Sequence, residues 1–223
     1  MKIKGAIFDM DGTLVDSLMY WDCLWERIGL AYMNDGTFRP SPEVDRAVRT
    51  MIYEDAMLYV KEQYHIDGDM DDFLRFTANG VPNFYQTVAH PKPGAVEILE
   101  HLKANGIKLC LASATAMGEI VSALEGYDMM KYFDVVLSCA DLGAGKDRPD
   151  IYLEALRQLE LPAGEVCVVE DSFVALETAK TVGLQTVGVF DRYNFGWDRL
   201  EQAADIYLDE QHTLHDLIGK LGR

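Results

Sequence analysis

The sequence predicts an α/β protein with a doubly wound, mostly parallel sheet and an inserted helical region. Short apolar runs of strand length recur along the chain, and the segments between them carry apolar residues at helical spacing. One long interval near the amino terminus breaks this alternation, because it holds helical patterns and no convincing buried strand. Strands that alternate with helices favour an open parallel sheet with helices on both faces.

The apolar runs and the residues that flank them give the expected elements in order. Strands are expected at residues 3–9, 107–112, 135–137, 166–169, 186–190 and, as a short last strand, 205–208. Helices between them are expected at residues 116–125, 149–159 and 172–182. Pro149 followed by Asp150 is typical of a helix start, whereas Gly126 and Gly183 are typical of helix ends.

Residues 17–90 are interpreted as a helical insertion that forms a cap over the sheet. Helical patterns cover residues 18–33, 43–64 and 70–79, and Pro91 and Pro93 mark the return to alternation. The alternative is that these helices merely pack on one face of the sheet. Single crossovers between strands are usually short, so an insertion is favoured. The chain then divides into an α/β core of residues 1–16 and 91–223 and a cap of residues 17–90.

The composition excludes several classes of partner. Lys and Arg number 20 against 37 Asp and Glu, and the net charge of −17 argues against nucleic acid or an anionic membrane surface. The apolar runs are too short to span a bilayer, and the first residues do not resemble a signal peptide, so a cytoplasmic protein is expected. The four cysteines lack the close pairs of a zinc site or a disulfide framework.

Polar residues stand where the expected strands end. The first strand ends in Asp9 and Asp11, and residues two apart in an extended chain point to the same side. The other polar groups are Ser113-Ala114-Thr115 after the second strand, Gly143-Ala144-Gly145-Lys146 after the third and Glu170-Asp171-Ser172 after the fourth. In a doubly wound sheet, ligands bind outside the carboxyl ends of the strands. These residues are therefore expected to meet in one site.

The acidic residues of this set indicate a magnesium site. Four acids without a cation would repel one another, and magnesium prefers oxygen ligands while keeping waters and substrate oxygens. Asp9 and Asp171 are the best candidates for direct ligands, with Glu170 either bound or one shell out.

The remaining residues suit a phosphoryl group. Lys146 would neutralise phosphoryl oxygens and Ser113 would donate a hydrogen bond. A helix starting just after Ser113 would add backbone amides, beginning with Ala114. Taken alone, such a lysine is usually a solvated loop residue and such a serine a helix cap.

Asp9 and Asp11 can divide the chemistry between them. A carboxylate can attack phosphorus and form an aspartyl-phosphate. A neighbour two residues on can protonate the leaving oxygen and then take a proton from the attacking water. The pair thus covers both half-reactions.

Together these segments resemble the haloacid dehalogenase-like phosphohydrolases over essentially the whole chain. Residues 9–13 match the first motif of that family, Ser113 the second, Lys146 the third and residues 170–172 the fourth. The resemblance implies that Asp9 is the nucleophile, that Asp11 is the acid/base, and that the backbone carbonyl of Asp11 reaches the magnesium. The third motif departs at Asp147, where the family usually has proline.

The insertion resembles the helical cap of the branch that contains phosphoglycolate phosphatase-like and β-phosphoglucomutase-like enzymes. The mutases place a cap histidine near the position that Trp21 occupies in this chain. The absence of that histidine favours a phosphatase over a mutase. Trp21, Arg46 and Arg49 are the candidate substrate residues of the cap, although most helix charges are simply solvated.

The expected function is therefore a magnesium-dependent phosphatase of a small phosphorylated metabolite, such as a sugar phosphate or a phosphoglycolate-like compound. A hexose phosphate mutase is the alternative. A receiver-type phospho-aspartate signalling domain is disfavoured, since it would carry its phosphoacceptor after a middle strand and lack a large cap. No nucleic acid or membrane partner is expected, and a monomer is compatible with the sequence.

Overall fold

The computed structural model describes residues 1–49, 51–79 and 81–222, and of residues 81–83 it describes the backbone alone. The main sheet has the strand order β5-β4-β1-β6-β7-β8, and every neighbouring pair is parallel. Its strands are β1 (Gly5–Phe8), β4 (Lys108–Ser113), β5 (Val135–Ser138), β6 (Val166–Glu170), β7 (Gln185–Val189) and β8 (Ile206–Leu208). Each of the six expected strands is confirmed, and so is the doubly wound fold class.

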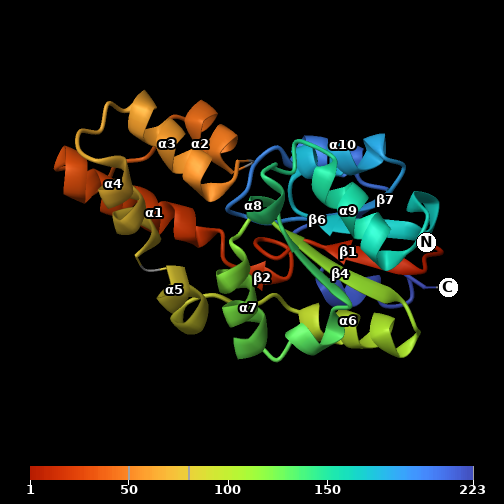
Figure 1. Cartoon of the computed structure of the whole chain (residues 1–223). Coiled ribbons are helices and arrows are strands. Elements are labelled where there is room, and N and C mark those ends of the chain that lie inside the picture. Colours follow the sequence, from red (N-terminus) through yellow and green to blue (C-terminus); the bar gives the residue numbers. More distant parts are fainter. Residues whose placement is uncertain (50, 80, 223) are drawn as a thin grey trace.

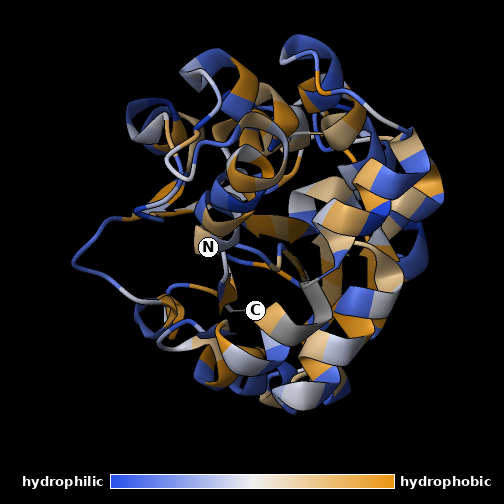
Figure 2. Ribbon diagram, turned by 90° about the vertical axis from the view of Figure 1, so that its left-hand side faces the viewer, coloured by the Kyte–Doolittle hydropathy of each residue, from blue (hydrophilic) through white to orange (hydrophobic). Residues whose placement is uncertain are grey.

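Helices cover both faces of this sheet (Figure 1). The core helices are α6 (Ala95–Ala104), α7 (Met117–Gly126), α8 (Cys139–Leu142), α9 (Asp150–Leu159), α10 (Phe173–Thr181) and α11 (Trp197–Ala203). Successive residues of β1 serve opposite faces, as the pleat of a strand requires. Ala6 and Phe8 pack in the layer that contains α6 and α7, while Ile7 packs in the layer that contains α9 and α10. Figure 2 shows the central strands mainly in the hydrophobic colour.

A helical insertion follows the first strand, and its helices share a separate apolar core. It comprises α1 (Met19–Ile28), the π-helical turn Gly29–Met33, α2 (Pro42–Val48), α3 (Tyr53–Gln63), α4 (Met70–Ala78) and α5 (Val81–Thr87). Trp25 and Phe73 are each 1% exposed at the centre of this core. Phe84 and Tyr85 of α5 pack instead with the sheet layer that contains α7.

The two chain segments that join the insertion to the sheet lie against each other. β2 (Val15–Asp16) and β3 (His90–Pro91) form a small antiparallel ladder in which Val15 pairs with Pro91 and Asp16 with His90. The insertion thus leaves and rejoins the core at one place.

The expectation of one helix over residues 43–64 is wrong, because the chain breaks between α2 and α3. Ile52 is extended, with φ −66° and ψ 151°, which ends any continuous helix there. The break lets Ile52 pack against the core layer of α9 and α10 while α2 and α3 remain in the insertion. Burial of apolar surface therefore overrides the local helical pattern. Within the described ranges, no helix has the length and apolar character needed to cross a membrane.

Candidate active site

A cavity of about 510 Å³ lies between the carboxyl ends of the strands and the helices of the insertion. Its floor holds Asp9, Asp11, Ser113, Ala114, Lys146, Glu170 and Asp171. Its wall includes Trp21 and Arg49 from the insertion, whereas Arg46 does not line it. β1 lies between β4 and β6, where the strand order reverses, so the ends of these strands open onto one crevice.

A tight turn after β1 brings the first two carboxylates to this crevice. Gly12 has φ +81°, a conformation that L side chains rarely adopt. A Cβ atom at Gly12 would lie 2.3 Å from Oδ2 of Asp171, so the turn and the end of β6 approach too closely for any side chain. The hydroxyl of Thr13 donates to Oδ1 of Asp171 at 3.3 Å and joins the same two segments.

Asp9, Glu170 and Asp171 form a buried acidic cluster. They are 6%, 2% and 4% exposed, and one carboxylate oxygen from each lies within 4.8 Å of the other two. Lys146 Nζ donates to Asp9 Oδ1 and, at 2.6 Å, to Glu170 Oε1. The other oxygen of Glu170 accepts from the backbone amides of residues 171 and 172 at 2.9 and 3.0 Å. An all-oxygen donor set with excess negative charge fits a hard divalent cation.

The pKa values of Asp9 and Asp171 are raised, as expected where buried carboxylates outnumber cations. Burial raises the pKa of Asp9 to about 8, and Glu170 and Asp11 add to the rise while Lys146 opposes it. Burial, followed by Glu170 and Asp9, raises the pKa of Asp171 well above its usual range. Burial lowers the pKa of Lys146, but its two carboxylate partners more than offset this and hold the pKa well above the usual value. One lysine thus leaves the cluster short of positive charge.

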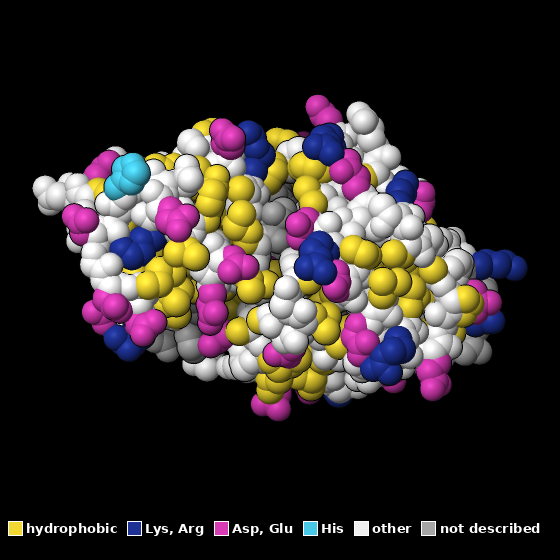
Figure 3. All heavy atoms as spheres, turned by 45° about the horizontal axis from the view of Figure 1, so that its top comes forward, with side chains coloured by type: hydrophobic (Ala, Val, Ile, Leu, Met, Phe, Trp, Pro, Cys, Tyr) yellow, Lys and Arg dark blue, Asp and Glu magenta, His cyan; other side chains and the backbone are white. Residues whose placement is uncertain are grey.

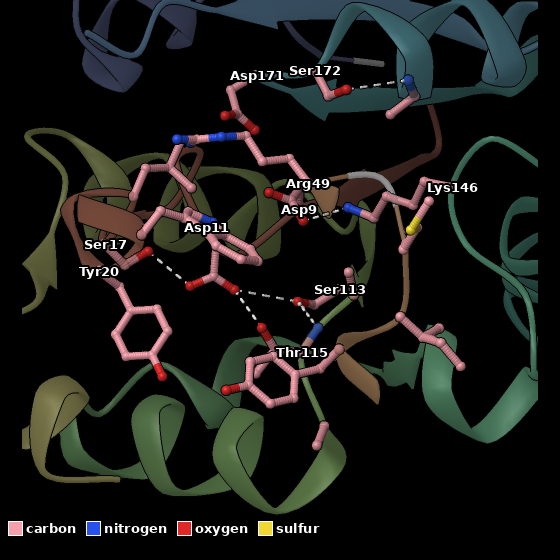
Figure 4. A pocket seen from close by; sticks show the side chains of 18 of the residues that line it. Asp9, Asp11, Ser17, Tyr20, Arg49, Ser113, Thr115, Lys146, Asp171 and Ser172 are labelled. Carbon is pink, nitrogen blue, oxygen red and sulfur yellow. Dashed lines mark hydrogen bonds and ion pairs between the residues drawn. The ribbon is translucent and has the colours of Figure 1, made fainter. Parts of the chain in front are cut away.

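Among the described residues, the hydrogen-bond donors to the Asp11 carboxylate are hydroxyl groups (Figure 4). Its Oδ1 accepts from Ser17 Oγ at 2.7 Å and from the Tyr85 hydroxyl at 2.6 Å. Its Oδ2 accepts from Thr115 Oγ1 at 2.7 Å and from Ser113 Oγ at 3.4 Å. The segment that leaves the core, helix α5 of the insertion and the end of β4 therefore all meet at this carboxylate.

Several of these contacts could not be read from the sequence. The sequence places Thr115 at a strand end but assigns it no role, and Tyr85 belongs to no motif. Asn194 was also missed, although its side-chain amide donates to Asp171 Oδ2 at 2.6 Å and to the backbone oxygen of the same residue at 3.1 Å. The helix expected just after Ser113 begins at Met117, so residues 113–116 form a turn that lines the cavity.

The candidate arginines of the insertion differ in position. Arg49 Nε lies 2.9 Å from Asp45 Oδ2, and its guanidinium lies over the ring of Trp21 at 5.7 Å. Arg46 is exposed and lies over the ring of Phe195 at 5.9 Å.

Comparisons with known proteins identify the family of the chain. Residues 3–183 match the family model of haloacid dehalogenase-like hydrolases. The phosphorylated carbohydrates phosphatase of Thermotoga maritima is 28% identical over 216 residues, which cover 96% of this chain and 98% of that protein. The phosphoglycolate phosphatase of Escherichia coli is 26% identical over 247 aligned residues, which cover 99% of this chain and 93% of that protein. The structure of CbbY from Rhodobacter sphaeroides in complex with phosphate shares the fold, with a TM-score of 0.78 at 22% identity and 96% coverage of both chains.

Proposed function

Because the chain belongs to the haloacid dehalogenase-like hydrolases and is a phosphoric monoester hydrolase of that family, we propose that it hydrolyses a small phosphorylated metabolite with the help of Mg²⁺. One observation carries the proposal. The side chains of Asp9, Asp11, Ser113, Lys146, Glu170 and Asp171 converge in a single cavity at the carboxyl ends of β1, β4 and β6.

The first half-reaction transfers the phosphoryl group to Asp9. A carboxylate oxygen of Asp9 forms a bond to phosphorus while the bond from phosphorus to the leaving oxygen breaks. Asp11 gives its proton to that oxygen, and the alcohol departs neutral. Ser113 and Lys146 line the floor beside Asp9, where they can donate hydrogen bonds to the phosphoryl oxygens.

The second half-reaction returns the enzyme to its starting state. Asp11, now a carboxylate, takes a proton from a water molecule, whose oxygen attacks phosphorus. The bond between phosphorus and the Asp9 oxygen breaks, and inorganic phosphate and the free carboxylate of Asp9 are the products.

The side chains of Asp9, Glu170 and Asp171, with the backbone carbonyl of Asp11, would hold the magnesium ion. The ion would offset the negative charge of the phosphoryl group beside these acids. Lys146 also offsets negative charge here, since it pairs with Asp9 and Glu170.

Residues 17–90 are proposed as the cap that selects the substrate. Support comes from the cavity wall, much of which this insertion supplies, including Trp21 and Arg49. The names of the two phosphatase relatives point to phosphorylated carbohydrates or phosphoglycolate as the substrate class.

Release of inorganic phosphate from a panel of sugar phosphates and phosphoglycolate, with MgCl₂ or with excess EDTA, tests the proposal. Asp9→Asn should lower kcat by at least about 10³-fold, since the nucleophile is lost. Asp22→Asn is the matched control, because Asp22 is a half-exposed residue of α1 that does not line the cavity. Equal phosphate release by Asp9→Asn and wild type would refute the assignment of the nucleophile. Conversion of β-glucose 1-phosphate to glucose 6-phosphate without phosphate release would identify a mutase instead.

A further inference from the structure

We propose that the cavity selects phosphomonoesters whose leaving group is uncharged, such as polyol or sugar monophosphates, and discriminates against those that carry a second anionic group. This inference rests on the proposed phosphatase function and narrows its substrate class. It comes from the charges of the cavity wall away from the reacting carboxylates.

Most of that wall is apolar or aromatic. The side chains are Leu18, Tyr20, Trp21, Met51, Ile52 and Phe195. Such a surface suits the carbon faces of an uncharged sugar or polyol. None of these six side chains is cationic, so none would offset the hydration that a carboxylate or a second phosphate loses there.

The positive charges of the wall are already occupied. Among the described lining residues, the basic side chains are Lys146, which lies in the acidic cluster and serves the phosphoryl group that every substrate carries, and Arg49. Arg49 donates from Nε to Asp45 Oδ2 at 2.9 Å and from Nη2 to Asp45 Oδ1 at 3.3 Å. Its remaining nitrogen, Nη1, donates to the backbone oxygen of residue 193 at 3.1 Å. Three of the five N–H groups of this guanidinium therefore have partners, its charge is paired with Asp45, and the side chain is 12% exposed.

Acidic side chains stand in the same wall. Glu54 from α3 and Glu119 from α7 both line the cavity and do not belong to the acidic cluster of Asp9, Glu170 and Asp171. Oε2 of Glu119 is buried and has no hydrogen-bond partner among the described residues, so a substrate hydroxyl would supply a donor that a second anion cannot. The net charge of −17 adds a repulsive field for doubly anionic ligands, and Figure 3 shows acidic side chains spread over the face of the molecule that it displays.

Two pairs of substrates that differ in a single charge test the inference. The first pair is 2-hydroxyethyl phosphate and phosphoglycolate, and the second is sorbitol 6-phosphate and 6-phosphogluconate. In each pair a CH₂OH group of one member is replaced by a carboxylate in the other. We expect kcat/KM to be about tenfold or more higher for the uncharged member, mainly through KM, because like charges repel across the cavity.

A variant that releases Arg49 tests the cause. Asp45→Asn removes the ion pair but keeps an oxygen for the indole nitrogen of Trp25, which donates to Asp45 Oδ1 at 3.0 Å. The variant should raise kcat/KM for phosphoglycolate and 6-phosphogluconate by about tenfold, while the uncharged members change by less than about threefold. Asp72→Asn is the matched control, because it breaks an exposed arginine pair with Arg75 outside the cavity. Glu119→Gln should likewise raise kcat/KM for the charged members relative to the uncharged ones. Circular dichroism would establish that each variant is folded.

The outcomes separate the two proposals. Equal or faster hydrolysis of the charged members by wild type would overturn the inference and leave the phosphatase function intact. If Asp45→Asn and Glu119→Gln left the preference of wild type unchanged, the cause assigned to it would be wrong. No phosphate release from any of the four compounds in the presence of Mg²⁺ would count against the proposed function itself.

Discussion

Tyr85 is predicted to position Asp11 for proton transfer, and Tyr85→Phe removes its hydroxyl alone. That hydroxyl donates to Oδ1 of Asp11 at 2.6 Å, and Tyr85 is buried against the sheet layer. Negative charge develops on Asp11 as it gives its proton to the leaving oxygen. A donor fixed in advance stabilises that charge without further reorganisation.

The size of the effect follows from the donors that remain. A hydrogen bond to a charged group contributes about 1.5–3 kcal/mol, and about 1.4 kcal/mol corresponds to a factor of ten in rate. Ser17 still donates to Oδ1 and Thr115 to Oδ2, both at 2.7 Å, so the carboxylate keeps its orientation. The loss in kcat/KM should therefore lie near the lower end, at about tenfold for alkyl phosphates.

The assay compares leaving groups. An alkoxide needs the proton of Asp11, whereas p-nitrophenolate departs without one, so Tyr85→Phe should lower kcat/KM for p-nitrophenyl phosphate by less than about threefold. Tyr20→Phe is the control, because Tyr20 lines the same cavity but its hydroxyl donates to the backbone oxygen of Thr77 at 3.1 Å. The control should affect both substrates to a similar extent. An equal loss on both substrates in Tyr85→Phe would refute the role of Tyr85 in proton transfer.

Three further predictions concern the acidic cluster. Burial raises the pKa of Asp9 to about 8, whereas an unfolded aspartate titrates near pH 4. The stabilisation that protonated Asp9 gives the folded state is therefore complete below about pH 4 and is lost as the pH rises to about 8. We expect Tm in EDTA to fall over that interval. Excess MgCl₂ should raise Tm most near pH 8, and a Tm indifferent to Mg²⁺ there would contradict the metal assignment. Gly12→Ala should lower activity by at least about tenfold and raise the Mg²⁺ concentration required, because the new Cβ would meet Asp171 Oδ2 at 2.3 Å. Gly118→Ala is the control, because a Cβ added at this position of helix α7 would meet no other part of the protein within 4 Å. It should raise Tm slightly, and an equal loss of activity in both variants would refute the steric argument. Lys146→Met should lower the free energy of unfolding of the metal-free protein by about 3–5 kcal/mol in urea titrations, since it leaves two buried carboxylates without their cation, and an unchanged urea midpoint would contradict this.

The sequence predicts the fold class and family correctly because both depend on local signals. A buried strand of four to six residues has a recognisable apolar run, and the polar residue that follows it must lie at the carboxyl edge of the sheet. Asp9, Ser113 and Glu170 could be assigned to one crevice on that rule alone. Their chemical roles stay predictions, as does the cytoplasmic location.

Contacts that depend on side-chain direction across long separations could not be predicted. Tyr85 reaches Asp11 across 74 residues, and nothing near it in the sequence marks that contact. The break between α2 and α3 depends on apolar contacts of Ile52 with a different part of the chain. The pairing of Asp45 with Arg49 could have been predicted from the sequence, because residues four apart on a helix face each other.

The short ladder between β2 and β3 makes the insertion an exchangeable module. Asp16 and His90 are paired, so the chain closes at the base of the insertion whatever its length. Each doubling of a flexible connection would cost only about 0.6 kcal/mol in closure entropy. A chimera that receives foreign helices between residues 18 and 79 would keep the register of the sheet, because the strand pairs of β1 lie outside the exchanged segment. Substrate preference could then diversify by recombination while the reacting groups stay where the first strand ends.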